Sequence, residues 1–539
     1  MSRMIRLLLL SAFAVGFSAT AAAQESDDAR RDATLADIRA MVEGAEGDTA
    51  LVVAVTDRDR MLMVASHGLA DVDRRIPAAP DTRFAIGSIS KSFTAVALMQ
   101  MADDGRFDPD APIARYLPDF RVRSDFAPIT GGALMSHTSG LPNYLAHVAS
   151  MRFLVTALQD FEPRYAPGAH FWYSNSGYQL LGYAAEAVDK APFPLILQRR
   201  ILDPLGMAST APQIDDRLRR KMATSYARAP NGDLVVAPWF EHLAADGAIV
   251  STAPDMTAYA RMLLTRGNSP QRRILSERAF ARLITPVRDD YGFGFDIGER
   301  GQMLFHTGSI MGFQAYFAVH LQQGLGIVIL GNGPADRTLR ERIVARLFNI
   351  APHQLPDLQW RGTEGFAGRF VGRGGRALLF RRGPSGDLLV DDGGGTLMLA
   401  RIAREAWGAH LTPAGPRAFL FFRDASGAVS EVVEGDATYA RENAALSADP
   451  PTGYRPLVGR YAAHGEEGPS VRIYARGAQL TMSYADSSLA MPLVEDGPGR
   501  FRFETPIYAP EWLQFDTVVE GKAERLVLNG VPLYRIDLP

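Results

Sequence analysis

Ser88 and Lys91 are the residues of this sequence whose types and spacing most clearly suggest chemistry. The sequence contains only four lysines, Lys91, Lys190, Lys221 and Lys522, and otherwise uses arginine as its basic residue. Lys91 stands three residues after Ser88, at the start of the apolar segment FTAVALMQMADDG. Because residues i and i+3 share a helix face, the spacing predicts that the Ser88 hydroxyl and the Lys91 amine touch.

A lysine at this position can do what an arginine cannot. The segment is apolar on nearly every side, so we expect a buried helix that ends at Gly105. Burial lowers the pKa of a lysine and can leave a neutral amine that accepts a proton, whereas arginine stays charged. Ser88 at the helix start would face unpaired backbone N–H groups that can hold an oxyanion. The pair predicts a nucleophile with its base, although S-x-x-K alone also occurs in ordinary surface turns.

Two further motifs lie downstream. Tyr173 and Asn175 place a phenol and an amide two residues apart in APGAHFWYSNSGYQLLG, after a Pro-Gly turn. His306-Thr307-Gly308-Ser309 is expected at the start of a strand, where the glycine would let a substrate backbone lie close.

In this order and at these separations the sequence resembles the penicillin-recognising serine hydrolases, whose motifs are S-x-x-K, Y-x-N and K-T-G. These are the serine β-lactamases, the DD-peptidases and the related esterases and D-aminopeptidases. The resemblance covers roughly residues 35 to 350. It includes the stretches SHTSGLPNY from Ser136, DPLGM from Asp203, DGAIVSTAPDM from Asp246, YGFGF from Tyr291, and GFQAYF after the HTG.

The resemblance implies a role for each motif residue. Ser88 would attack an acyl carbon and form an acyl-enzyme that water then hydrolyses. Lys91 and Tyr173 would share the proton transfers, and which of them is the base stays open; an aromatic at Tyr173 could also be plain core. Asn175 would hydrogen-bond a substrate amide. The backbone N–H groups of Ser88 and Ser309 would form the oxyanion hole.

His306 departs from the family pattern. The usual lysine is a fixed positive charge facing a substrate carboxylate, whereas an imidazole is mostly neutral near pH 7 unless a neighbour holds its proton. This makes a dedicated β-lactamase less favoured, and a histidine here is known among the family's DD-peptidases and D-aminopeptidases. His306, Thr307 and Gly308 are all expected to bind substrate. His137 and His170 are interpreted as structural.

Composition excludes several other functions. The chain has 57 basic and 60 acidic residues, a net charge of −3 and no arginine-rich run, which gives no electrostatic basis for nucleic-acid binding. No cysteine is present, so a thiolate, a disulfide and lipidation are excluded. No H-E-x-x-H or similar cluster suggests a metal, and no cofactor is implied. The expected partner is a small peptide, amide or ester substrate; the sequence leaves the oligomeric state open.

The first 23 residues have the pattern of a bacterial signal peptide. Arg3 and Arg6 precede the apolar run LLLLSAFAVGF, and Ala21-Ala22-Ala23 offers a cleavage site before Gln24. The run falls short of the ~20 apolar residues of a membrane span, so an uncleaved anchor is the weaker alternative. We therefore expect a periplasmic protein with no membrane span.

Residues 24–355 are expected to form one α/β domain with a largely antiparallel sheet. The segment DATLADIRAMVEGA has helical spacing, and LVVAVTDRDRMLMVASHGLADVD predicts two strands joined by a polar turn at Asp57 to Arg60. The strands MLFHTG, AYFAVHL and LGIVILGN and the helix RTLRERIVARLF close the domain.

The remaining chain changes character and repeats. After the proline-rich linker APHQLPDLQW, short β-type segments with many glycines predict two units, 356–447 and 453–539, joined by SADPPTG. Gly368-Arg369-Phe370 recurs as Gly459-Arg460-Tyr461, Leu388 parallels Leu480, Phe419 parallels Trp512, and Tyr439 matches Tyr534. Each unit has room for about eight strands, enough for a small antiparallel barrel, although two unrelated β-rich stretches could also look alike.

A serine hydrolase followed by two lipocalin-like barrels resembles the architecture of D-aminopeptidases, in which a loop of the last barrel selects a free D-amino-acid N-terminus. By that resemblance a loop within Tyr484 to Glu504 would reach the site, with Asp486, Glu495 and Asp496 as candidates for pairing with a substrate ammonium. For any one of these acids, a solvated turn residue is the favoured interpretation. The favoured function is a peptidase on D-residue peptides or amides, of the aminopeptidase or DD-carboxypeptidase type. A carboxylesterase or weak β-lactamase is the alternative, and a non-catalytic protein that binds a ligand or peptidoglycan fragment is the minor one.

Overall fold

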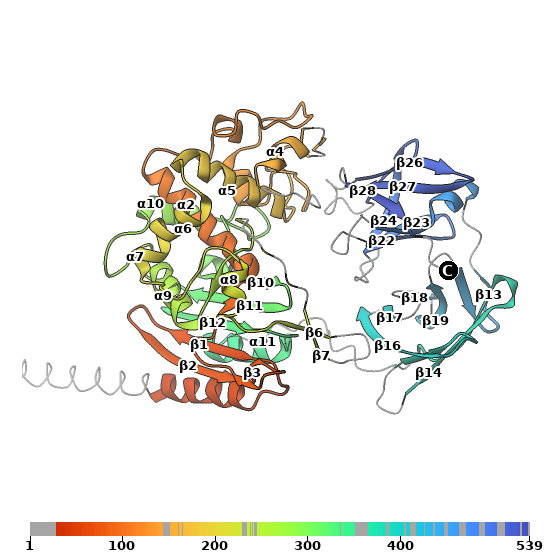
Figure 1. Cartoon of the computed structure of the whole chain (residues 1–539), viewed down its shortest axis with the longest axis horizontal. Helices are drawn as coiled ribbons and strands as arrows, with labels where there is room; N and C mark the ends of the chain where they lie inside the picture. Colours follow the sequence, from red (N-terminus) through yellow and green to blue (C-terminus); the bar gives the residue numbers. More distant parts are fainter. Residues whose placement is uncertain are drawn as a thin grey trace, which may run out of the picture.

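The structure is a computed structural model of the whole chain (Figure 1). It describes residues 29–536 apart from the segments 144–150, 160, 164, 229–233, 238, 240, 242–244, 335, 351–364, 384–387, 404–405, 410–416, 425, 435–436, 447–450, 463–469, 485–490, 504–511 and 529–530. The expected signal peptide and both expected linkers fall wholly or partly outside this range. So do the domain boundaries at 355/356 and 447, which stay predictions.

A six-stranded antiparallel sheet forms the centre of the first domain. Its order is β2-β1-β12-β11-β10-β9, with every neighbouring pair antiparallel, as the sequence predicts. The strands are β1 (Leu51–Thr56), β2 (Met61–His67), β9 (Asp296–Gly298), β10 (Met303–Ile310), β11 (Phe313–His320) and β12 (Leu325–Gly331). The N-terminal and C-terminal segments of the domain thus meet in one sheet, because β1 pairs along its length with β12.

Helices pack against the sheet and bury its apolar side chains. The helix over residues 29–43 and α11 (Arg337–Phe348) share one core with sheet residues such as Val53 and Ile327. A larger core surrounds α2 (Ser90–Asp103), α5 (Asn175–Asp189) and α9 (Ala253–Leu264). The remaining helices are α3 (Gly131–Met135), α4 (Phe153–Ala157), α6 (Phe193–Leu197), α7 (Asp203–Leu205), α8 (Asp216–Arg219) and α10 (Glu277–Leu283).

Short strands form pairs outside the sheet: β3 (Leu69–Asp71) with β4 (Ile76–Pro77), β5 (Phe84–Ala85) with β8 (Val250–Ser251), and β6 (Tyr226–Arg228) with β7 (Leu234–Val236).

Helix α2 is the buried helix that the sequence predicts, with one correction at its start. Residues 90–101 are all buried, and Gly105 follows the helix with φ +71°. The α-helix begins at Ser90, because Ser88 lies in a preceding 3₁₀ turn, η1 (Gly87–Ile89). The tighter turn still leaves Ser88 beside Lys91.

Two closed eight-stranded antiparallel barrels follow, as predicted, and lie beside the first domain in Figure 1. The first comprises β13 (Gly368–Gly372), β14 (Ala377–Arg382), β15 (Leu388–Asp391), β16 (Thr396–Ala403), β17 (Ala406–Ala409), β18 (Arg417–Arg423), β19 (Val429–Glu434) and β20 (Ala437–Arg441). The second comprises β21 (Gly459–Ala462), β22 (Ser470–Arg476), β23 (Gln479–Tyr484), β24 (Met491–Gly497), β25 (Arg500–Phe503), β26 (Trp512–Val519), β27 (Lys522–Leu528) and β28 (Val531–Arg535).

The barrels are copies of one unit. The repeated segments fall on the first, third, sixth and eighth strands of both barrels, which confirms the sequence repeat. Arg441 and Arg535 make the same contact in the two barrels. Each guanidinium lies about 5 Å from an aromatic ring of the first strand, 4.9 Å for Phe370 and 5.0 Å for Tyr461. In the structure, Arg441 of the first barrel therefore corresponds to Arg535 of the second. This alignment of the eighth strands differs by one residue from the match of Tyr439 with Tyr534 in the sequence.

Aromatic and aliphatic side chains fill the described part of each barrel. In the first barrel Phe370, Phe380 and Phe421 contact one another, with ring centroids 4.9 to 5.9 Å apart. This packing gives no support to a ligand-carrying role for that barrel. Among the described residues, no helix has the length and apolar character needed to span a bilayer.

Candidate active site

Ser88 is held at the meeting point of a turn and two strands. β5 and β8 pair just before it, and the Ile249 N–H donates to Ser90 Oγ at 3.1 Å just after it. Gly87 adopts φ +51°, a left-handed conformation that favours glycine. The nucleophile candidate is thus fixed from both sides while its side chain stays partly accessible.

Lys91 has no exposed surface and makes three polar contacts. Its Nζ lies 2.6 Å from Asn175 Oδ1, 2.7 Å from the Asp246 carbonyl oxygen and 3.2 Å from Ser88 Oγ. Two of these partners are carbonyl oxygens, which only accept hydrogen bonds. A protonated amine donates a third hydrogen bond to Ser88 Oγ, whereas a neutral amine would give its two N–H groups to the carbonyl oxygens and turn its lone pair to the Ser88 hydroxyl.

The environment favours this neutral amine, as expected from sequence. Burial lowers the pKa of Lys91 to about 8, and the negative charge of Asp246 partly offsets that effect. With a pKa of about 8, Lys91 is mostly protonated at pH 7, and the neutral form that can accept the Ser88 proton becomes the main form above pH 8.

The rate of acylation is therefore expected to rise with pH. Lys91 is protonated below a pKa of about 8 and free to act as a base above it, so activity should be lost as pH falls through that value. The check is kcat/KM for an uncharged ester between pH 5 and 10, which should climb to a plateau with a midpoint near 8. A profile that stays flat across pH 6 to 9 would contradict Lys91 as the base.

Tyr173 and Asn175 are brought to Lys91, as the motif order implies. Lys91 Nζ lies 4.9 Å from the centroid of the Tyr173 ring. Asn175 is the first residue of α5, and its Nδ2 donates to Asn143 Oδ1 at 2.8 Å while its Oδ1 accepts from Lys91. Asn175 thereby positions Lys91, and its second Nδ2 hydrogen is the one that a substrate carbonyl would use.

β10 passes so close to η1 that only glycines fit between them. A Cβ on Gly308 would lie 1.9 Å from the Ile86 carbonyl oxygen and 3.3 Å from Ser88 N, and a Cβ on Gly87 would lie 2.7 Å from Ser309 N. The backbones of η1 and of β10 at Gly308 and Ser309 are therefore in close contact, which is compatible with the expected oxyanion hole between Ser88 and Ser309. β9 pairs with β10 only up to Phe305, and the HTGS motif lies in the second half of β10, not at its start as expected.

His306 is buried and neutral. Its Nδ1 donates to the Thr307 carbonyl oxygen at 2.5 Å, so its Nε2 accepts from the Tyr291 hydroxyl at 3.2 Å. Burial and the nearby Lys91 charge lower the pKa of His306 to about 4, against the opposing hydrogen bond to Thr307. The position that carries a fixed cation in much of the family therefore carries no charge at neutral pH.

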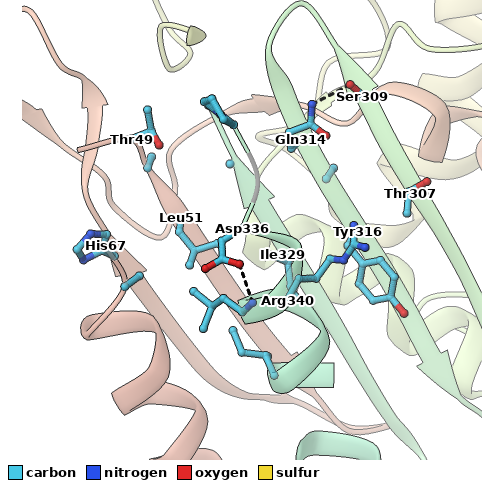
Figure 2. Close-up of a pocket in the computed structure, with 18 of the residues that line it drawn as sticks. Thr49, Leu51, His67, Thr307, Ser309, Gln314, Tyr316, Ile329, Asp336 and Arg340 are labelled. Carbon is cyan, nitrogen blue, oxygen red and sulfur yellow. Dashed lines mark hydrogen bonds between the residues drawn. The ribbon is translucent and has the colours of Figure 1, made fainter. Parts of the chain in front are cut away.

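A pocket of about 490 Å³ opens on the other face of β10 (Figure 2). The exposed Thr307 and Ser309 side chains line it, and Ser309 Oγ accepts from Gln314 Nε2 at 2.8 Å. Asp336, which caps α11, and Arg340 line the opposite side. Strand β10, which carries the HTGS motif, thus also borders a cavity large enough for part of a substrate.

Of the barrel acids that were expected near the active site, only some lie among the described residues. Asp486 lies outside the described residues, and Glu495 and Asp496 are exposed on β24, where Asp496 pairs with Arg502 at 3.8 Å. Arg500, the first residue of β25, forms an ion pair with Glu162 of the first domain at 3.5 Å. This contact places the start of β25 against the hydrolase domain.

Sequence reasoning missed four residues that complete the site. Asp246 and Asn143 bond Lys91 and Asn175, and Tyr291 and Tyr178 form a buried pair beside His306 and Lys91. Burial raises the pKa of both tyrosines well above the ordinary value, so both stay neutral. Three of the four lie inside stretches already noted for the resemblance, DGAIVST, SHTSGLPNY and YGFGF, which was the available signal.

Comparisons with known proteins agree with this geometry. Protein flp of Staphylococcus aureus is 24% identical over 295 residues, which cover 52% of this chain and 58% of flp, so the match spans under two thirds of that relative. The octameric penicillin-binding protein homologue from Pyrococcus abyssi superposes with a TM-score of 0.54 at 20% identity, covering 77% of this chain and all of that one. SurE superposes with a TM-score of 0.54 at 26% identity, covering 77% of this chain and all of SurE. A second structure, SurE with D-Leu, superposes with a TM-score of 0.51 at 24% identity.

The family model named Beta-lactamase matches residues 38–348. This span is more than half of the chain, and it contains Ser88, Lys91, Tyr173 and the HTGS segment of β10. The chain therefore belongs to the β-lactamase family, which is a family of serine hydrolases.

Proposed function

We propose that this protein is a periplasmic serine peptidase that acts on peptides or amides containing a D-residue, through an acyl-enzyme on Ser88. The observation that carries the proposal is the bonding of Lys91. Its Nζ lies within hydrogen-bond distance of two carbonyl oxygens and of Ser88 Oγ, so the neutral amine would keep its lone pair for the Ser88 hydroxyl. Proton transfer to Lys91 would release the serine oxygen to attack an acyl carbon, and the N–H groups of Ser88 and Ser309 would receive the oxyanion.

Neutral His306 favours one substrate type within this chemistry. A substrate with a free carboxylate next to the scissile bond gains most from a fixed cation, and His306 carries no charge when its pKa is near 4. This observation supports an aminopeptidase or amidase over a DD-carboxypeptidase. The pocket behind Thr307 and Ser309 offers room for the part of the substrate beyond the oxyanion strand. The D-Leu present in a SurE structure supports the choice of D-residues.

The test is hydrolysis of D-alanine and L-alanine p-nitroanilide by the mature protein, with the Ser88→Ala variant as control. Release of p-nitroaniline from the D form only, and loss of that release in Ser88→Ala, is the expected result. Faster turnover of short acyl esters with no preference between D and L amines would replace the peptidase with the carboxylesterase. Hydrolysis only of peptides ending in D-Ala-D-Ala would replace it with the carboxypeptidase.

Deletion of residues 451–539 is expected to change substrate choice more than chemistry. The second barrel meets the hydrolase domain through Arg500 and Glu162, and Pro163, next to Glu162, packs on Gly140 of the SHTSG loop. The ratio of kcat/KM for D-alanine and L-alanine anilides should fall, while the rate on a small acyl ester should persist. An unchanged ratio in the folded truncated protein would make the barrel a scaffold. Arg500→Ala, which removes the ion pair and the contact of the guanidinium with the Trp512 ring, is the smaller change.

A further inference from the structure

His137 belongs to the SHTSG segment but takes no part in the chemistry described above. It is fully buried and adopts φ +57°, a left-handed conformation that is uncommon outside glycine and enriched in asparagine, aspartate and histidine. Its Nε2 meets no hydrogen-bond partner within the part of the chain that the structure describes. A buried donor without a partner costs folding free energy, so an imidazole here calls for a compensating role.

The compensating contacts all go to the segment that carries Tyr173 and Asn175. The Trp172 N–H donates to the His137 carbonyl oxygen at 2.6 Å, and the Ser174 N–H donates to His137 Nδ1 at 3.0 Å. One residue thus binds the backbone on both sides of Tyr173.

The His137 ring also lies against the tyrosines of the site. Its centroid is 4.2 Å from that of Tyr173, with 34° between the ring planes, and 5.1 Å and 5.0 Å from those of Tyr178 and Tyr291. Lys91 in turn lies over the rings of Tyr173 and Tyr178. The imidazole is the common neighbour of the aromatic groups that surround the base.

The role of Nδ1 requires a neutral ring, and the site keeps it neutral. Because a backbone N–H donates to Nδ1, the ring proton must sit on Nε2. Burial, and then repulsion from the protonated forms of Lys91 and His306, hold the pKa of His137 well below its usual range. The titratable groups that face it are Lys91, His306, Tyr173, Tyr178 and Tyr291.

We propose that His137 is a positioning residue: it fixes Tyr173 and Asn175 against Lys91 through its carbonyl oxygen, its Nδ1 and its ring. The inference rests on the proposed function, since it matters only if these residues carry out acyl transfer. Asn175 depends on His137 indirectly, because the intervening Ser174 is bonded by Nδ1 and Asn175 holds Lys91. Loss of the acceptor would let the segment move and misplace the base relative to Ser88.

Two substitutions separate the acceptor from the ring. His137→Asn keeps an acceptor oxygen close to the place of Nδ1 and tolerates the left-handed backbone. His137→Phe keeps an aromatic ring in the cluster and removes the acceptor. His170→Asn is the matched control, because His170 is exposed and its ring packs on Tyr165, away from Lys91.

The readouts are the second-order rate of Ser88 phosphonylation by a fluorophosphonate, kcat and KM on the D-alanine anilide, and the melting temperature. In phosphonylation the Ser88 oxygen bonds phosphorus, the P–F bond breaks, fluoride leaves and Lys91 takes the proton.

We expect His137→Phe to lower kcat and the phosphonylation rate by about 10²-fold with KM little changed, since an error of 1 Å in placement has that effect. His137→Asn should stay within about tenfold of the wild type on the same scale, and His170→Asn should not differ from it.

Equal losses in the Asn and Phe variants that follow their melting temperatures would overturn the proposal, as would full activity in His137→Phe. If His137→Phe does not fold, the His137→Asn variant still tests the proposal. A folded His137→Asn that reacts as slowly as a Lys91 variant would show that an acceptor at this position does not keep Tyr173 and Asn175 in place, and it would overturn the proposal. Phosphonylation needs no D-amide. Failure of the proposed substrate would therefore leave these rates measurable and would be distinguished from failure of this inference.

Discussion

Replacing Lys91 by methionine is expected to reduce turnover by about 10²- to 10⁴-fold, the range that a general base contributes. Methionine has a similar length and suits the buried position, but it has no lone pair for the Ser88 proton and no N–H groups for Asn175 and Asp246. Lys91→Arg should lose activity as fully, because its side chain keeps a positive charge and cannot be deprotonated. The measurement is kcat on a Ser88-dependent substrate, with the melting temperature of each variant recorded beside it.

The two Lys91 variants together separate charge from proton transfer. If positive charge were the only requirement, Lys91→Arg would keep activity where Lys91→Met lost it. If neither were required, a folded Lys91→Met would turn over like the wild type, and Tyr173 would have to supply the base. The account predicts that both fail while Lys190→Met, outside the site, stays active.

Gly308→Ala is expected to lower kcat by at least about 10²-fold, the effect of losing one oxyanion-hole donor. The added Cβ would lie 1.9 Å from the Ile86 carbonyl oxygen, a separation that no side-chain rotation relieves because both groups are backbone. β10 must therefore move away from η1 and carry the Ser309 N–H out of reach of the oxyanion. The loss should fall on kcat more than on KM, because the donor acts most strongly in the transition state.

The matched control for this substitution is Gly298→Ala. Gly298 lies on β9 in the same sheet, and its added Cβ would have ordinary contacts, the nearest at 3.4 Å from Phe305. The control should keep both activity and melting temperature. Full activity in a folded Gly308→Ala would mean that the oxyanion is not held between η1 and β10.

Much of the fold was predictable because local pattern and tertiary structure agree. The two β-type segments in residues 51–67, joined by a polar turn, give the β1–β2 hairpin, and the apolar run after Ser88 gives α2. The repeat between Gly368 and Gly459 gave two barrels of equal strand number. The start of α2 was placed two residues early, because the sequence does not distinguish a 3₁₀ turn from the first turn of an α-helix.

The site was predictable only where a motif carried it. Ser88, Lys91, Tyr173 and Asn175 were found through motifs that resemble those of the family, and the structure brings them together. The Asp246 carbonyl oxygen could not be found that way, because any residue provides a carbonyl and only the turn at 245–247 aims this one at Lys91. The role of His137 was hidden for the same reason: its Nδ1 acts on a backbone N–H 37 residues away.

The most direct test of the central claim is the location of the covalent adduct after treatment with a fluorophosphonate. Trypsin should release residues 84–91, FAIGSISK, which contain both Ser88 and Ser90, and fragmentation by mass spectrometry distinguishes the two. The account predicts one phosphonyl group on Ser88, formed faster above pH 8 than at pH 6, and none in Ser88→Ala. An adduct on another serine, or no adduct on the folded wild-type protein, would contradict Ser88 as the nucleophile.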